Sequence, residues 1–402
     1  MAELSSDERA VVERANAEPM LDQVLAWAAV NSGSRNLAGL ERMADLLIEA
    51  FAALPGPIRL EPPAKVETID GEGRTARIEH GRHLHLTVRP AAPVQLLFTG
   101  HMDTVYAADH PFQETRWLED GLLNGPGVAD MKGGLAVMLA ALKAVEKSAA
   151  AQSIGYEVII NSDEEVGSPA SASLLSRAAT GKRAALTYEP SALPDGTLAG
   201  ARPGSGNFSF LVKGRAAHAG RNPEDGRNAI VAASELALRL AMSKTPGLSI
   251  NPAKIDGGSP NNVVPDLAIL RVNMRPRTTD DQEIAARLIA KALDETAAAH
   301  DVFIEAHGGF GRPPKPLTEE AEALFALVKK AGDDLGQMVA WQPSGGVCDG
   351  NNIAACGVPV VDTMGVRGGK IHSAEEFLIT ESLAERAALS ALTILRLAAE
   401  DA

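Results

Sequence analysis

Residues 94–99 form an apolar run, Val-Gln-Leu-Leu-Phe-Thr, that leads directly into the segment Gly100-His101-Met102-Asp103. A run of this length is typical of a strand that is buried inside a parallel sheet. His101 and Asp103 stand two residues apart at its carboxyl end, so their side chains are expected to point to the same side. Open α/β sheets place their ligands outside the carboxyl ends of their strands, so this run predicts such a sheet with a functional site at that end.

Segments with strand and helix patterns alternate over much of the chain, which favours a mostly parallel α/β sheet flanked by helices. The chain has 402 residues, more than one ordinary hydrophobic core holds, so two domains are expected. The predicted helices of the first domain are residues 7–30, 36–53, 132–147, 319–332 and 381–400. Its predicted strands are residues 64–70, 76–80, 83–88, 94–100, 156–160, 184–188 and 358–362.

The pattern changes in the middle of the chain, where a smaller domain is predicted. Its expected order is strand, helix, strand, strand, helix, strand, which is typical of a ferredoxin-like α+β fold. These elements are residues 207–213, 227–240, 248–256, 266–275, 280–299 and 302–307. We therefore predict that residues 1–202 and 314–402 form one α/β domain, and that residues 203–313 are inserted into it.

Charge and composition exclude several classes of function. The formal net charge is −14, which argues against a nucleic-acid partner because phosphates would be repelled. We find no apolar run long enough to span a bilayer, so no membrane partner is expected. Residues 1–8 lack the basic and apolar regions of a secretory signal, and the chain has only two cysteines, so a cytoplasmic location with reduced thiols is expected.

Five potential metal ligands follow predicted strands or stand in glycine-rich turns: His101, Asp130, Glu165, Glu189 and His372. Imidazole and carboxylate groups suit zinc, cobalt or manganese. Two ions could share Asp130 as a bridge, one with His101 and Glu189 and the other with Glu165 and His372. Three protein ligands per ion would leave an open position for water, which is typical of a catalytic site. Two close ions lower the pKa of a water and polarise a substrate carbonyl.

Two further carboxylates could assist such a site. Glu164 is adjacent to a predicted ligand but should point elsewhere, which suits a general base. Asp103 could accept a hydrogen bond from the ring nitrogen of His101 that does not bind metal.

Each predicted ligand also has a structural interpretation that the sequence leaves open. His101 and His372 could be exposed residues, Asp130 could cap a helix, residues 163–165 could be a solvated acidic turn, and Glu189 could simply end a strand. The joint occurrence of the five residues in similar settings favours the metal site.

At these residues the chain resembles the M20 family of metallopeptidases, and most of all its glutamate carboxypeptidase (carboxypeptidase G2-like) branch. Six motifs run in the family's order over nearly the whole chain. They are Gly100-His101-Met102-Asp103-Thr104-Val105, Gly125-Pro126-Gly127-Val128-Ala129-Asp130-Met131-Lys132-Gly133-Gly134, Asp163-Glu164-Glu165-Val166-Gly167-Ser168, Glu189-Pro190-Ser191, Ala217-His218-Ala219-Gly220 and His372-Ser373.

The resemblance implies a role for each residue of the metal site. It implies two zinc ions per chain, with cobalt or manganese as alternatives, and Asp130 as the bridging ligand. It also implies that Glu164 is the catalytic base, that Asp103 orients a ligand, and that the peptide bond after Asp130 is cis. The implied zinc ligands are His101, Asp130, Glu165, Glu189 and His372.

The resemblance also implies that the inserted domain forms a homodimer interface and acts as a lid. His218 would reach the active site of the partner and stabilise an oxyanion, although a purely structural histidine is an alternative. Asn262 would contact substrate, but it could instead be a turn residue. Arg275, and with less support Arg312, would bind a substrate carboxylate through the planar guanidinium group. Arg275 could also be a strand-surface charge.

One segment departs from the family pattern. Val347 and Cys348 stand where related proteins often have Gly and Ser or Thr, in a loop that helps form the substrate pocket. The side-chain preference for substrate therefore stays open. Cys348 is expected to be a small buried thiol, and Cys356 is expected in the core.

Together these features predict a dinuclear zinc hydrolase, a metallopeptidase of the glutamate carboxypeptidase type, that cleaves the amide bond of an acylated or peptidyl amino acid with a free carboxylate. The alternatives within the family are an N-acyl-amino-acid deacylase, of the acetylornithine or succinyl-diaminopimelate type, and a dipeptidase. An alternative of another class is a non-catalytic metal-dependent binding protein. The glycine-rich junctions near residues 204 and 309 are expected to act as hinges between the lobes.

Overall fold

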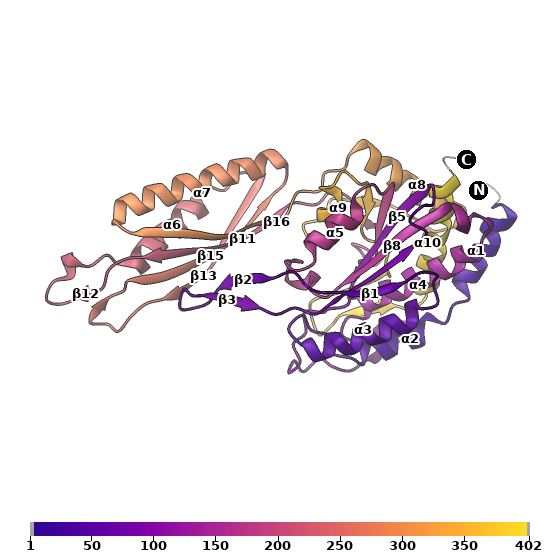
Figure 1. Ribbon diagram of the computed structural model, residues 1–402, viewed down its shortest axis with the longest axis horizontal. Helices are drawn as coiled ribbons and strands as arrows, with labels where there is room; N and C mark the ends of the chain where they lie inside the picture. Colours follow the sequence, from indigo (N-terminus) through magenta and orange to yellow (C-terminus); the bar gives the residue numbers. More distant parts are fainter. Residues whose placement is uncertain (1–3, 400–402) are drawn as a thin grey trace.

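A six-stranded sheet forms the centre of the larger lobe in this computed structural model, which describes residues 4–399 (Figure 1). The strand order is β1-β4-β8-β5-β9-β18. Strand β4 is antiparallel to both of its neighbours and the remaining pairs are parallel, so five of the six strands run in one direction. The predicted mostly parallel sheet is confirmed. The strands are β1 (Ile58–Glu61), β4 (His83–Val88), β5 (Val94–His101), β8 (Ile154–Asn161), β9 (Ala184–Thr187) and β18 (Val360–Val361).

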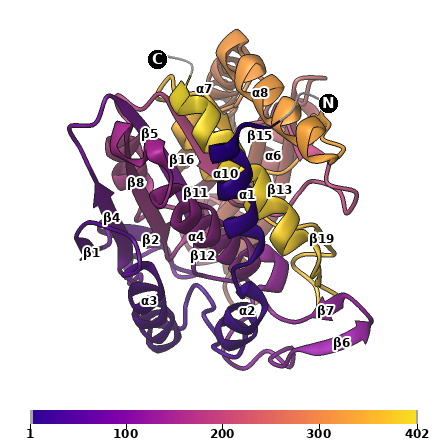
Figure 2. The ribbon, with the colours of Figure 1, turned by 90° about the vertical axis from the view of Figure 1, so that its right-hand side faces the viewer.

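Helices cover both faces of this sheet. In β5, Leu96 and Phe98 face one hydrophobic core and Leu97 faces another, as expected for a strand buried on both sides. The larger core includes α1 (Ser6–Asn16), α2 (Met20–Ala28), α3 (Leu37–Phe51), α4 (Gly133–Glu146), α8 (Glu319–Leu335) and α10 (Ser382–Ala399). The smaller core includes α5 (Ala172–Ala179) and α9 (Asp349–Ala354). Helices α1, α4 and α10 pack against one another on the larger core (Figure 2).

Helix α4 packs very closely against the strand region that leads to the functional site. A Cβ atom on Gly134 would lie 2.0 Å from the main-chain oxygen of Tyr188, so only glycine fits there. This close contact holds the amino-terminal end of α4 against the chain between β9 and Glu189.

The smaller lobe is a four-stranded antiparallel sheet with the order β13-β15-β11-β16, and α6 and α7 pack on one face of it. The chain order strand, helix, strand, strand, helix, strand and this strand order together give the predicted ferredoxin-like arrangement. The elements are β11 (Ser205–Lys213), α6 (Ala229–Met242), β13 (Leu248–Gly257), β15 (Leu267–Pro276), α7 (Thr279–His300) and β16 (Phe303–Arg312).

A hairpin from the larger lobe lies against the other face of this smaller sheet (Figure 1). It consists of β2 (Val66–Ile69) and β3 (Thr75–Ile78), which pair in antiparallel fashion. Ile69 packs against Leu211 and Ile269 in a small separate cluster. Arg271 donates a hydrogen bond of 2.9 Å to the main-chain oxygen of Ile69. The lobes are thus joined by this hairpin as well as by the two chain crossings.

Two expectations from the sequence are corrected. The single helix expected at residues 7–30 is instead α1 and α2, because Pro19 cannot continue a helix and stands just before α2. Cys356 is exposed rather than in the core, because it follows the end of α9 in a surface turn. The edge strand β1 was not predicted, and neither were the further short strands β6 (Arg116–Glu119), β7 (Leu122–Asn124), β10 (Leu198–Ala199), β12 (Ala217–His218), β14 (Val263–Val264), β17 (Trp341–Gln342), β19 (Gly368–Gly369) and β20 (Phe377–Ile379).

Within residues 4–399, the structure has no helix that is both long enough and apolar enough to cross a membrane.

Candidate metal centre

Three adjacent parallel strands place their carboxyl ends at the candidate site. His101 is the last residue of β5 and stands in register with Asn161, the last residue of β8. The turn that carries Glu164 and Glu165 follows β8, and Glu189 follows β9 on the other side of β5. The strand pattern recognised in the sequence therefore brings these side chains to one edge of the sheet.

Asp130 stands between two groups of ligand candidates and contacts each with a different carboxylate oxygen. Asp130 Oδ1 lies 3.1 Å from His101 Nε2, which is also 3.7 Å from Glu189 Oε1. Asp130 Oδ2 lies 3.3 Å from His372 Nε2, which is also 3.1 Å from Glu165 Oε2. The peptide bond between Asp130 and Met131 is cis, as the resemblance implied. The structure thus brings together the five predicted ligands in two groups of three that share Asp130.

His372 differs from the other four residues of this set in exposure and in backbone conformation. Its side chain is 54% exposed, whereas His101 is 1% exposed. Its φ angle is 62°, in the left-handed region that residues other than glycine rarely adopt. Such backbone conformations are concentrated at functional sites, where the surrounding structure holds a side chain in place.

Asp103 contacts both His101 and the turn that carries Glu164 and Glu165. Its Oδ1 accepts the Glu164 N–H at 3.1 Å, and its Oδ2 accepts the Glu165 N–H at 3.2 Å and the Ser34 hydroxyl at 2.7 Å. His101 Nδ1 lies 2.9 Å from the main-chain oxygen of Asp103 and 3.5 Å from its Oδ1. Asp103 therefore contacts His101 most closely through its main chain, while its carboxylate binds the turn after β8.

The predicted base Glu164 lies beside Arg312. Arg312 Nη2 is 2.6 Å from Glu164 Oε1, in an ion pair that lacks hydrogen-bond geometry. Arg312 also donates to the main-chain oxygen of Glu164 and to Ser168 Oγ, each at 3.0 Å, and lies 3.5 Å from Asp349 Oδ1. The sequence reasoning missed Asp349, although it follows the unusual Val347-Cys348 segment directly. A substrate-binding role for Arg312 stays a prediction, since its guanidinium contacts protein groups here.

Burial and mutual repulsion of the carboxylates dominate the electrostatics of the site. Burial, together with the nearby Asp130 carboxylate, raises the pKa of Glu165 to about 8. Burial also raises the pKa of Glu164 to about 7, against the opposing effect of Arg312. Hydrogen bonds to Asp130 and Glu165 raise the pKa of His372 to about 11. A bound cation would stabilise such a cluster of buried carboxylates in its ionised form.

The donor set suits divalent ions of the zinc class. One ligand atom each from His101, Asp130 and Glu165 lies within 4.8 Å of the others, and the same holds for His101, Glu164 and Glu189. Imidazole and carboxylate are the ligands that zinc and related ions take in catalytic sites. Both of these sets contain His101, so they are overlapping sets and not two separate ion sites, unlike the two groups that share Asp130. Glu164 belongs to one of the sets by distance, but it is also paired with Arg312.

Two cavities meet at the candidate centre. One, of about 230 Å³, is lined by residues that include Glu189, Arg202 and Cys348. The other, of about 890 Å³, lies between the lobes and is lined by residues that include Arg275 and Arg312. Both are also lined by Glu164, Glu165 and His372. A substrate could therefore extend to both sides of the centre.

The structure does not bring His218 and Asn262 to the centre of their own chain. His218 is in β12, at the end of the smaller lobe that is far from the six-stranded sheet (Figure 1). Asn262 lies beside it, since its main-chain oxygen accepts a hydrogen bond of 2.9 Å from Ala219 N. Both residues are exposed.

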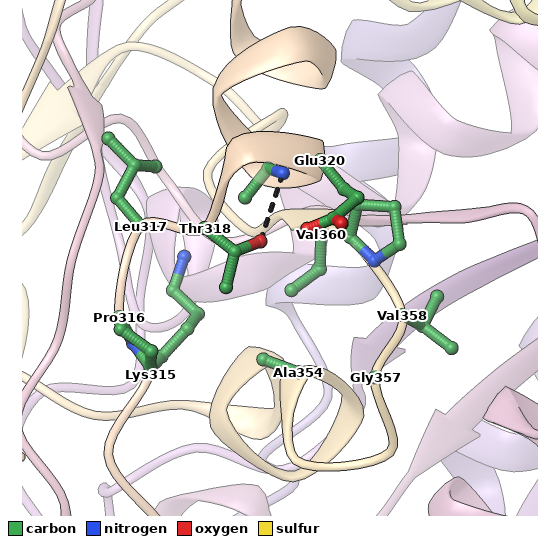
Figure 3. Close-up of a pocket in the computed structure, with 11 residues that line it drawn as sticks. Lys315, Pro316, Leu317, Thr318, Glu320, Ala354, Gly357, Val358 and Val360 are labelled. Atoms are coloured by element: carbon green, nitrogen blue, oxygen red, sulfur yellow. Dashed lines mark hydrogen bonds between the residues drawn. The ribbon is translucent and has the colours of Figure 1, made fainter.

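A separate pocket of about 330 Å³ lies at the start of α8, beside α9 and the turn before β18 (Figure 3). Its walls include Leu317, Val358 and Val360, with Glu320 as an acidic lining residue. Lys315 also lines it, but its ammonium group pairs with Asp362 at 3.0 Å. Among its lining residues there is no predicted metal ligand, so this pocket does not form part of the candidate centre.

Sequence reasoning also missed Glu376, a buried residue four positions after His372. Its carboxylate accepts hydrogen bonds from Gly127 N, Ala129 N and Asp130 N, at 3.1, 2.9 and 3.1 Å. Its proximity to His372 in the sequence is the one signal that could have indicated it.

Comparisons with known proteins find a matching peptidase family and relatives of this chain. Residues 97–396 match the sequence model of peptidase family M20/M25/M40. Carboxypeptidase G2 of Pseudomonas sp. (strain RS-16) is 31% identical over 317 residues, which are 76% of this chain and 74% of that protein. Succinyl-diaminopimelate desuccinylase of Psychrobacter arcticus is 28% identical over 338 residues, which are 77% of this chain and 80% of that protein.

A solved structure shares the fold over nearly the whole chain. It is the YXEP protein of Bacillus subtilis, described as a dinuclear metal-binding peptidase of the M20 family. The TM-score is 0.63 at 15% sequence identity, and the match covers 97% of this chain and 99% of that one.

Proposed function

The chain belongs to peptidase family M20/M25/M40, and we propose that it is a dinuclear zinc-class exopeptidase that hydrolyses the amide bond of a peptidyl or acylated amino acid with a free carboxylate. The observation that carries this proposal is the arrangement around Asp130. Its two carboxylate oxygens contact two separate groups, one with His101 and Glu189 and the other with Glu165 and His372.

In this proposal, two bound ions would activate water and polarise the scissile carbonyl. Glu164 takes the proton of the attacking water and delivers it to the leaving amine. Its position suits this task, because Glu164 lines both cavities that meet at the centre. Arg312 lies against Glu164 and holds its carboxylate at the edge of the centre.

The remaining predicted residues are assigned to substrate. Arg275 lines the cavity between the lobes, where its guanidinium group can bind a substrate carboxylate. His218 and Asn262, which are remote from their own centre, are proposed to reach the centre of the partner in a homodimer. His218 would there donate to the oxyanion of the tetrahedral intermediate. The cytoplasmic location remains an expectation from the sequence.

Relatives suggest where the substrate search should begin. The similarity to carboxypeptidase G2 supports a glutamate carboxypeptidase activity first, on N-acyl or peptidyl glutamates. The similarity to succinyl-diaminopimelate desuccinylase supports an N-acyl deacylase as the second candidate. Val347 and Cys348 line the smaller cavity, so they are placed to select between acyl groups.

The proposal is tested by metal content and turnover in the wild-type protein and in Glu164→Gln. We expect about two ions per chain in both proteins, and a turnover in Glu164→Gln that is lower by about 10²- to 10⁴-fold, as for loss of a general base. Chelation should abolish wild-type hydrolysis of N-acyl glutamates, and zinc or cobalt should restore it.

The other outcomes are equally informative. A Glu164→Gln protein with full turnover would contradict the assignment of the base. A wild-type protein that binds no metal after reconstitution would overturn the proposed centre. Two bound ions without turnover on any acyl amino acid or dipeptide would favour a non-catalytic binding protein.

A further inference from the structure

A buried carboxylate holds the loop that carries the bridging residue Asp130. Glu376 is 1% exposed, and it lies in the segment that follows the ligand candidate His372. Its Oε1 accepts the N–H groups of Ala129 and Asp130, and its Oε2 accepts the N–H group of Gly127. Three of the four main-chain N–H groups of residues 127–130 therefore converge on one side chain.

The hydroxyl group of Tyr106 connects this carboxylate to a third segment. Tyr106 is 3% exposed and follows the His101–Asp103 segment by three residues. Its hydroxyl oxygen lies 2.8 Å from Glu376 Oε2 and 2.8 Å from the main-chain oxygen of Ser373, the residue after His372. The segments that carry His101, Asp130 and His372 thus meet at Tyr106 and Glu376.

We propose that Glu376 and Tyr106 are positioning residues that set the Asp130 carboxylate at the correct distance from His101 and His372. This inference rests on the proposed metal centre. Their hydrogen bonds to the ligand-bearing segments are made to main-chain groups, so both act through the main chain. Because Asp130 belongs to both ligand groups, a shift of its loop would disturb both ion sites together.

A carboxylate is suited to this place because it has acceptor atoms only. All three main-chain groups are donors, so each carboxylate oxygen can accept without opposition. An amide at the same position would direct an NH₂ group against at least one of these donors. Glu376→Gln therefore removes one of the two oxygen acceptors while it keeps the size of the side chain.

The test measures cobalt binding by the folded protein rather than turnover. Wild type, Glu376→Gln and Tyr106→Phe are stripped of metal and titrated with Co²⁺ against a chelating dye, and the visible absorption spectrum of each cobalt form is recorded. For Glu376→Gln we expect about 10- to 100-fold weaker binding of both ions and an altered spectrum, the range found for groups that orient metal ligands. Tyr106→Phe keeps the three main-chain bonds, so we expect a smaller but measurable loss of affinity, about two- to tenfold.

Two matched variants control for substitution and for the loss of a tyrosine hydrogen bond. Glu375→Gln makes the same change one residue earlier, where the side chain is exposed and pairs with Lys370. Tyr156→Phe removes a similar buried hydrogen bond, of 2.8 Å to Glu146, in a part of the lobe away from the centre. Both should bind two Co²⁺ ions with the wild-type affinity and spectrum.

The possible results separate this inference from the proposed function. If wild type binds two ions and Glu376→Gln binds them with unchanged affinity and spectrum, the inference is wrong, even where thermal stability has fallen. If wild type itself binds no ions, it is the proposed function that fails. If Glu376→Gln does not fold, the result for Tyr106→Phe decides. A Co²⁺ affinity and spectrum equal to those of Tyr156→Phe would then overturn the inference.

Discussion

Asp362 shows how single residues of this chain stabilise buried charge. It is fully buried and accepts hydrogen bonds of 2.8 and 3.0 Å from Arg202, while Lys315 lies 3.0 Å away. Burial alone would raise its pKa, but attraction to these two cations outweighs burial and lowers the pKa to about 2. The ionised form is therefore favoured in the folded state.

We predict that Asp362→Asn lowers the free energy of unfolding at neutral pH by about 3–5 kcal/mol, because Arg202 and Lys315 lose their buried partner. The folded pKa lies below the ordinary value of 3.8, so the stabilising effect is present above that value and is lost as the pH falls toward about 2. Urea unfolding of both proteins at several pH values measures this. The difference in free energy of unfolding between the two proteins should become smaller as the pH falls toward about 2.

Glu305→Gln is the matched control for this prediction. Its pair with Lys213 is on the surface, so its loss should change the free energy of unfolding by less than about 1 kcal/mol. A difference between Asp362→Asn and wild type that does not depend on pH would contradict the assigned ionisation.

Single residues differ in how far the sequence identifies them. The five ligand candidates could be found because each follows a strand or stands in a glycine-rich turn of a known motif. Asp349, Asp362 and Glu376 were not identified, because most of their partners are far away in the chain and position alone does not indicate what they bind. Arg202 and Asp362, for example, are 160 positions apart, and only the folded chain brings them together.

At the scale of elements, carboxylates that bind main-chain N–H groups fix the loops of the centre. Asp103, at the end of β5, binds the N–H groups of Glu164 and Glu165 after β8. Glu376 binds three N–H groups of the loop before α4. Each carboxylate joins two segments that are distant in sequence, so the centre is held by contacts between loops as well as by the sheet.

We predict that Asp103→Asn lowers kcat/KM by about 10- to 100-fold, because an NH₂ group would face the N–H group of Glu164 or Glu165 and displace the turn. Ser34→Ala is the matched control, since it removes only the third hydrogen bond of the same carboxylate. We expect a smaller effect from it. Steady-state kinetics with metal analysis on both variants would check this. If the two variants have equal kcat/KM, the prediction that the Asp103 carboxylate holds the turn is wrong.

The sequence predicts long elements better than short ones. The strands β4 and β5 and the helices α4 and α7 lie close to their expected places, because each has a long apolar run or several periods of apolar residues. Two-residue strands such as β12 and β19 show no periodicity at all. They exist because distant segments meet, as β12 does with β14.

At the scale of the whole molecule, the order of elements was enough to predict a ferredoxin-like lobe inserted into an α/β lobe. The β2–β3 hairpin was predicted as strands, but its packing against the smaller lobe was not. Ile69 reaches Leu211 and Ile269 there, through contacts that leave no local pattern in the sequence. The relation between the lobes therefore depends on features that the fold class does not specify.

The position of His218 makes the dimer the smallest complete unit in the proposed function. Glu164 lies in the larger lobe, whereas β12 with His218 lies at the far end of the smaller lobe (Figure 1). If His218 serves the partner, every active site takes Glu164 from one chain and His218 from the other. A substitution of Glu164 then impairs the active site of its own chain, whereas a substitution of His218 impairs the active site of the partner chain.

This arrangement predicts complementation between two inactive variants. Glu164→Gln and His218→Ala homodimers should each have little activity. In a mixed dimer, one site has both defects and the other has none, so random exchange of subunits should restore about a quarter of wild-type activity. Activity is measured after the two proteins are unfolded and refolded together in equal amounts. Mixtures that stay as inactive as the separate variants, although mixed dimers form, would show that His218 does not act on the partner's site.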